Sequence, residues 1–214
     1  MDSIGDGSVA LQGFPALERL IYNKTPISNE PVKGETVSRC AAAIAIGHNI
    51  ANLAASLEKD ISAPNPFGAD VKEATKTLFG VLVTSLQVVY QLKLRAPAGE
   101  EGKLKPRLAE NWRSKRALLN VQQNLAAMKA FYLALYGPGG EEDPEHQLII
   151  NQFDAALTTA KGLGKSVAAV LTQEHGRLQV RALSSTIDDT KNLIAEKLTE
   201  HLNVNLGFNA LDGD

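Results

Sequence analysis

The chain has 214 residues, of which 44% are hydrophobic and 21% charged, so it is long enough to bury a substantial core. Lysine and arginine number 22 and aspartate and glutamate 24, and the formal net charge is -2. This balance, without long blocks of one sign, excludes the broad basic surface of a nucleic-acid-binding protein. The single cysteine, Cys40, excludes an intramolecular disulfide and is expected to be a small buried hydrophobic residue.

Apolar residues recur at intervals of three and four, and alternating strand patterns are absent. The sequence therefore predicts an all-α fold, an up-and-down bundle of about six helices. The first helix is predicted from about Ser8 to Asn23 and the second from about Glu35 to Lys59. The third, from about Ala69 to Leu94, is apolar nearly all round and should be the most central.

A loop from Arg95 to Pro106 leads to the fourth helix, whose apolar seam runs from Leu118 to Leu135. The fifth predicted helix carries a similar seam from Ile149 to Val170. The sixth is predicted from about Arg177 to Leu202, with Ile187, Ile194, Leu198 and Leu202 directed inward. No segment is predicted to cross a membrane, and no internal repeat is present. We therefore expect residues 1–214 to form a single helical domain.

The first predicted helix contains LQGFPALERLIY at positions 11–22. This stretch resembles the signature region of the imelysin family, where a Gly-x-His-x-x-Glu motif is expected. Three further stretches are similar to that family: Arg39-Cys40, PRLAENWRS at 106–114 and LGFNALDGD at 206–214. The four stretches occur in order and span nearly the whole chain.

The resemblance implies a bacterial cell-envelope protein, periplasmic or in the outer envelope, with a signal or lipoprotein leader. Family members are described as metallopeptidases and as components of iron uptake. The family also has several helices upstream of the signature. We expect these to be absent here, so that the chain is the C-terminal portion of an imelysin-like domain. Helix faces left uncovered would favour a homo-oligomer.

The family motif is altered in this sequence, because Pro15 stands where histidine is expected. Glu18 thereby loses its nearest partner for a shared cation. Proline within a helix predicts a kink between Leu11 and Pro15, eased by Gly13. The pattern also places Glu18 on one face with Leu11, Phe14 and Ile21. A carboxylate drawn into that setting needs a proton, a cation or a hydrogen bond.

Arg39 and Arg113 are the predicted partners of Glu18, since both lie in family-like segments. The predicted binding residues are accordingly Gly13, Pro15, Glu18, Arg39, Trp112 and Arg113, with no catalytic residue and Glu18 as a metal-ligand candidate. Two interpretations stay open: a buried ion pair that fixes helix register, and a ligand pocket at the kink.

The four histidines, His48, His146, His175 and His201, form no His-Glu-x-x-His motif. His48 is expected in the core or at its boundary, and His146 in a solvated acidic turn that caps a helix. Glu196, Glu200 and His201 are expected to be exposed charges, with a divalent-ion site as the alternative.

The basic run from Lys103 to Arg116 is expected to tie helices together while Trp112 plugs an end of the bundle. An anionic-ligand site is the alternative for this run.

The preferred hypothesis is a non-enzymatic envelope protein that binds iron, a divalent metal or another small ligand in connection with iron uptake. An imelysin-type metallopeptidase is the alternative, and a structural or interaction domain is the third. No nucleic-acid partner is expected.

Overall fold

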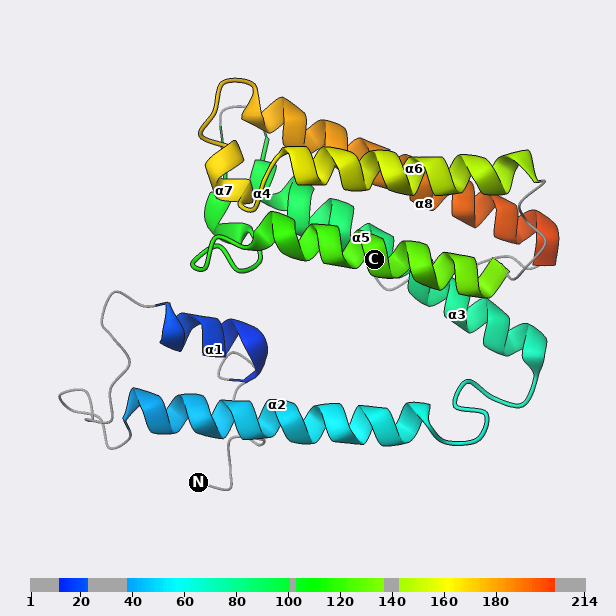
Figure 1. Ribbon diagram of the computed structural model, residues 1–214, viewed down its shortest axis with the longest axis horizontal. Helices are drawn as coiled ribbons and strands as arrows, with labels where there is room; N and C mark the ends of the chain where they lie inside the picture. The colour runs from blue at the N-terminus through cyan, green and yellow to red at the C-terminus, as the bar shows by residue number, and fades with distance from the viewer. Residues whose placement is uncertain (1–11, 23–37, 101–102, 137–142, 203–214) are drawn as a thin grey trace. The chain divides into compact units, whose positions relative to one another are not determined.

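The computed structural model describes residues 12–22, 38–100, 103–136 and 143–202 (Figure 1). Over these residues the regular elements are helices, and an isolated β-bridge joins Glu100 to Lys103. The prediction of an all-α helical bundle is confirmed. The chain divides into two compact units, Met1–Pro66 and Phe67–Asp214, which are taken in turn.

The first unit contains α1 (Gly13–Ile21) and α2 (Arg39–Ile61), which pack against each other. Ser38 has an extended backbone, and its hydroxyl accepts a hydrogen bond of 3.1 Å from the amide of Ala41. A serine at this position satisfies an amide that the first helical turn leaves without a partner. For this reason α2 begins later than the periodicity predicted, at Arg39 instead of Glu35.

The second unit is a bundle of the long helices α3 (Val71–Gln87), α5 (Ala117–Tyr136), α6 (Pro144–Gly162) and α8 (Gly176–Leu202) (Figure 1). Helix α3 contacts α5 and α8, and α6 contacts the same two helices. Four helices in this cyclic arrangement enclose one apolar core.

The predicted seams line this core. The buried seam residues are, from α5, Leu118, Val121, Leu125, Met128 and Tyr132; from α6, Ile149, Phe153, Ala156 and Ala160; and from α8, Ile187 and Ile194. The side chains of Leu198 and Leu202 lie outside the described part of the structure. Helical spacing thus identified the core of the bundle correctly.

The predicted fifth helix is interrupted, although its apolar seam is not. Helix α6 ends at Gly162, Gly164 takes a positive φ of 92°, and the short helix α7 (Val167–Val170) begins after Ser166. The Ser166 hydroxyl accepts a hydrogen bond from the amide of Ala169, so it caps a new helix start. Prediction of a single helix was wrong because Val167 and Val170 remain buried and keep the spacing across the break.

Helix α3 continues without a turn into a π-helix, η2 (Val88–Arg95), and the short α4 (Ala96–Ala98). Val89 and Leu94 are both fully buried, whereas Leu92 is 50% exposed. In an α-helix, residues five apart differ in direction by about 140°. The wider π-turn brings them to the same face. The hydroxyl of Ser184 donates a 3.2 Å hydrogen bond to the carbonyl of Tyr90 within this segment.

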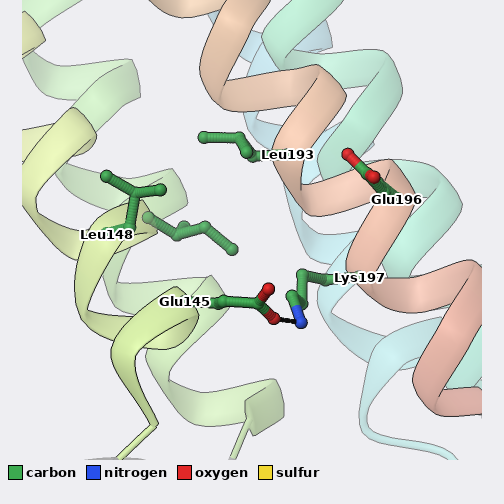
Figure 2. Close-up of a pocket in the computed structure, with 6 residues that line it drawn as sticks. Glu145, Leu148, Leu193, Glu196 and Lys197 are labelled. Atoms are coloured by element: carbon green, nitrogen blue, oxygen red, sulfur yellow. Dashed lines mark ion pairs between the residues drawn. The ribbon is translucent and has the colours of Figure 1, made fainter.

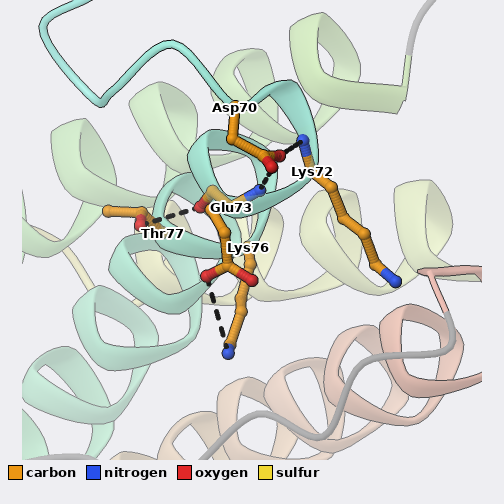
Figure 3. A network of polar contacts seen from close by, with 5 residues as sticks. All are labelled: Asp70, Lys72, Glu73, Lys76 and Thr77. Carbon is orange, nitrogen blue, oxygen red and sulfur yellow. Dashed lines mark hydrogen bonds and ion pairs between the residues drawn. The ribbon is translucent and has the colours of Figure 1, made fainter.

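The start of α3 is fixed by its own side chains, as Figure 3 shows. Asp70 accepts hydrogen bonds of 2.8 and 3.1 Å from the amides of Lys72 and Glu73. Lys76 forms an exposed ion pair of 3.8 Å with Glu73, and the Thr77 hydroxyl donates to the Glu73 carbonyl. The aspartate cap places the helix start at Val71, close to the predicted Ala69.

Two stretches of helix in the described part of the chain, Arg39–Ile61 and Val71–Ala98, are long and apolar enough to cross a membrane, by length and composition alone. No segment of this kind was predicted from the sequence. The second stretch supplies much of the bundle core, and a core helix passes the same test. Helix α2 is little buried, and Leu53 and Leu57 are each 59% exposed.

Candidate functional site

The signature segment forms α1, and its proline lies in the first turn of that helix. Gln12 is extended, and Gly13 at the helix start has a positive φ of 78°. Because the first amides of a helix have no carbonyl partner within it, proline at the third residue removes no hydrogen bond. The predicted kink is therefore wrong for the described residues, where Pro15 helps to begin the helix and does not bend it. Leu11 lies outside these residues.

Glu18 is buried, as predicted, with 9% of its surface exposed, and Ala16 is the other buried residue of α1. The apolar surroundings predicted for Glu18 are wrong in part, because Phe14 is 68% and Ile21 49% exposed. The acid lies on the inner side of a short helix, while Phe14 and Ile21 point outward. Burial of a carboxylate at such a position constrains how α1 packs.

Arg39, the first residue of α2, is buried with 7% of its surface exposed. Its guanidinium donates a hydrogen bond to the carbonyl of Leu20, near the end of α1. Cations are favourable at helix C-termini because the last carbonyls lack amide partners. Among the described residues of this unit, the two buried ionisable side chains thus sit on neighbouring helices, and Arg39 ties the end of α1 to the start of α2.

Trp112 and Arg113 belong to the second unit. The Arg113 guanidinium lies 4.4 Å from the centre of the Trp112 ring, and that of Arg107 lies 5.7 Å from it. Trp112 also packs against the core, which agrees with its expected position at an end of the bundle. The six predicted binding residues therefore form two groups: Gly13, Pro15, Glu18 and Arg39 in one unit, and Trp112 and Arg113 in the other.

A buried histidine lies between two tyrosines where α5 and α6 meet. His146 is 4% exposed, its ring centre lies 4.0 Å from that of Tyr136 and 5.3 Å from that of Tyr132. The Tyr132 hydroxyl is 3.1 Å from Nδ1 of His146. The expectation that this acidic turn caps a helix is confirmed for Asp143, whose carboxylate accepts a hydrogen bond from the amide of Glu145 at the start of α6. The solvated position expected for His146 is wrong.

The same carboxylate links the cap to the aromatic cluster, since the Tyr136 hydroxyl donates a hydrogen bond to Asp143. This bond lowers the pKa of Asp143 and raises the pKa of Tyr136. Burial raises the pKa of Tyr132 far above its ordinary value. Both phenols stay protonated and the carboxylate stays charged near neutral pH, so the cluster acts as a support that joins α5 to α6.

Acid should weaken this support, and Tyr136→Phe is the variant that shows it. A carboxyl whose pKa is lowered on folding adds stability above its ordinary pKa of 3.8 and loses it as pH falls through the lower folded value. We expect Tyr136→Phe to lower the melting temperature at pH 6, with the difference from wild type shrinking below about pH 4.

Thermal melts from pH 2.5 to 7 measure this difference. Asp143→Asn is the control, because asparagine keeps the helix cap but removes the titrating group. A pH-independent difference between wild type and Tyr136→Phe would show that the hydrogen bond to the carboxylate does not carry the effect.

A hollow of about 90 Å³ lies between α6 and α8, lined by Glu145, Leu148, Ile149, Leu193, Glu196 and Lys197. Figure 2 shows Glu145 and Lys197 directed toward one another across it, where they form an ion pair. Glu196 points away from that pair (Figure 2). Pockets that bind ligands of drug size have volumes of about 300–1,000 Å³, so this hollow is too small for one.

The remaining candidates are not gathered into a site. His48 is exposed, contrary to the core position expected for it, and Cys40 is half-buried rather than fully buried. His175 is exposed and lies 3.6 Å from Glu174. The side chains of Glu200 and His201 lie outside the described residues. Among the residues described, no three His, Cys, Asp or Glu side chains are grouped to hold a metal ion.

A family model described as imelysin matches residues 2–195. No curated protein and no solved structure matches the chain.

Proposed function

Because the chain belongs to the imelysin family, we propose that it is a cell-envelope protein that binds iron or another small ligand in iron uptake and does not catalyse a reaction. We place it in the periplasm or the outer envelope. The family resemblance supports the iron and envelope parts of this proposal.

The observation that carries the non-catalytic part is the first turn of α1. Proline has no side-chain atom able to ligate a metal, so Pro15 cannot replace an imidazole. Glu18 lies one turn further along but is buried at 9% exposure. A catalytic metal needs several protein ligands and an open position for water. The residues at positions 15 and 18 do not fit the family's His/Glu cation site.

The contact between α1 and α2 supports the same conclusion. Arg39 is buried on α2, and its guanidinium donates to the Leu20 carbonyl. A guanidinium has no electron pair to offer a metal, so Arg39 cannot serve as a ligand in this contact. We infer that this part of the protein serves packing, and that any iron binds elsewhere or as part of a chelate.

The proposal predicts that pure protein leaves casein and insulin undigested, while ferric or ferrous ion raises its melting temperature. A ligand that binds only the folded state raises the melting temperature, and the stabilisation grows with the logarithm of one plus the ratio of ligand concentration to Kd. Pro15→Ala is the matched control and should reproduce both results, since neither side chain ligates metal.

Two results would count against the proposal. Stoichiometric metal together with proteolysis that Glu18→Ala abolishes would establish the peptidase alternative. An unchanged melting temperature with both iron species would remove the link to iron. The association of chains through uncovered helix faces stays a separate prediction.

A further inference from the structure

The arginines of the second unit are all found at one end of its bundle. Four lie between positions 95 and 116, and two lie at 177 and 181, near the start of α8. These segments meet, because α4 contacts α8 and η3 (Pro106–Leu108) contacts both α4 and α7. The six residues are Arg95, Arg107, Arg113, Arg116, Arg177 and Arg181.

None of these six arginines forms an ion pair with a carboxylate in the described part of the unit. Its ion pairs all use lysine or histidine instead, such as Lys93 with Glu110 at 2.9 Å and Lys191 with Asp188 at 3.1 Å. Arginine is the better residue for a carboxylate or phosphate, because its planar guanidinium can donate two parallel hydrogen bonds. The side chains best suited to oxyanions are thus the ones without a protein carboxylate.

Arg177 and Arg181 converge on a single neutral atom. Each donates a hydrogen bond of 3.4 Å to the carbonyl oxygen of Gly99, which follows the last residue of α4. Two cations one helical turn apart repel each other, and one carbonyl dipole only partly offsets that repulsion. The long distances indicate weak bonds, since most such bonds measure about 2.9–3.0 Å.

Arg177 has a further unsatisfied group, because its Nε is buried and has no hydrogen-bond partner in the described structure. The residue also lies in the first turn of α8, which contains no acidic residue. Positive charge is unfavourable at a helix N-terminus, where the helix dipole favours an anion. The contacts of Arg177 within the described structure therefore leave its Nε unsatisfied and its charge without an acidic partner.

The acidic groups described near this end of the bundle form no ion pair with these arginines. Glu110 is held by Lys93 and by a 3.3 Å hydrogen bond from Asn120, and Glu174 lies beside His175. Glu100 follows Gly99, but its carboxylate forms no ion pair within the described residues. Arg107 and Arg113 lie over Trp112, so this end of the bundle gains further cations without adding a carboxylate.

We propose that Arg177 and Arg181, beside the Gly99 carbonyl, bind an oxyanion that bears a carboxylate or a phosphate group. The anion lies between the two guanidiniums and gives each a charge-assisted hydrogen bond. Arg177 turns toward it and its Nε gains a partner. This inference rests on the arginines of the second unit and not on the proposed role in iron uptake, so either can fail alone.

Isothermal titration of the full chain with citrate and with inorganic phosphate, at constant ionic strength in chloride, tests the site. We expect saturable binding of at least one anion with one site per chain. The Arg177→Gln/Arg181→Gln variant should weaken it at least tenfold. Lys72→Gln/Lys76→Gln, which removes equal charge from the start of α3, should bind as wild type does.

Arg177→Lys/Arg181→Lys separates charge from shape and serves if the glutamine variant does not fold, as judged by circular dichroism. Lysine keeps the charge but loses the two-pronged geometry, so binding weakens while the fold is retained. Tighter citrate binding identifies a carboxylate ligand, and tighter phosphate binding a phosphate ligand. The proposal is overturned if neither anion saturates, if the lysine variant binds like wild type, or if the Lys72/Lys76 control loses binding equally.

Discussion

Phe153→Ala is expected to destabilise the second unit by about 3–5 kcal/mol, the usual cost of removing a buried aromatic ring. Phe153 is fully buried in α6, and its ring centre lies 6.2 Å from that of Tyr132. The substitution leaves a cavity between α5 and α6, and packed helices fill such a cavity only in part. The melting temperature should fall by roughly 6–20 °C for a unit of this size.

The matched control is Leu148→Ala in the same helix. Leu148 is 44% exposed, so nearly half of its surface already contacts water, and we expect a loss of less than about 1 kcal/mol. Urea denaturation followed by circular dichroism measures both. Equal losses for the two variants would contradict the description of Phe153 as a central residue of the core.

Gly99→Ala is expected to destabilise the protein by more than about 1 kcal/mol, because its backbone and its surroundings both require glycine. Gly99 has φ of 61°, and a Cβ placed there would lie 2.0 Å from the carbonyl oxygen of Lys103. That oxygen is a backbone atom of Lys103, one of the two residues of the Glu100–Lys103 bridge, so it cannot move without shifting the backbone there.

Gly80→Ala supplies a control with the opposite sign. Gly80 lies inside α3, and a Cβ there meets nothing within 4 Å. Alanine in a helix interior is more stable than glycine by roughly 0.5–1 kcal/mol. The melting temperature should fall for Gly99→Ala and rise for Gly80→Ala. A neutral or stabilising Gly99→Ala would mean that the turn after α4 is not built as described.

The sequence predicted the fold well where helical spacing and caps agree. The seam of α5 gave the buried residues Leu118, Val121 and Leu125 directly, since one apolar stripe can pack on only one core. Spacing failed to predict the break after Gly162, because a new helix can begin in phase with the previous one. The signal was present in Gly164 and Ser166, which suit a turn and a helix cap.

The candidate site was predicted less well than the fold. Burial of Glu18 was predicted correctly, although the neighbours from which it was inferred, Phe14 and Ile21, are exposed. The kink at Pro15 did not occur, because a proline in the first turn of a helix removes no hydrogen bond. His146 was missed because its partners, Tyr132 and Tyr136, lie on another helix. Local pattern cannot show such a contact, although two tyrosines one turn apart at the end of a seam pointed toward it.

The π-helix η2 also determines which side of the helix axis faces the core in α4, which follows it directly. Its extra width aligns Leu94 and Ala98 with the core after Val89, and all three are fully buried. If Val88–Arg95 were wound as an ordinary α-helix, the residues after it would be rotated about the helix axis, by about 100° for each residue by which the register changed. The Gly99 carbonyl would then face a different direction from Arg177 and Arg181. The π-helix within this continuous helical stretch thus determines the direction of the Gly99 carbonyl at its end.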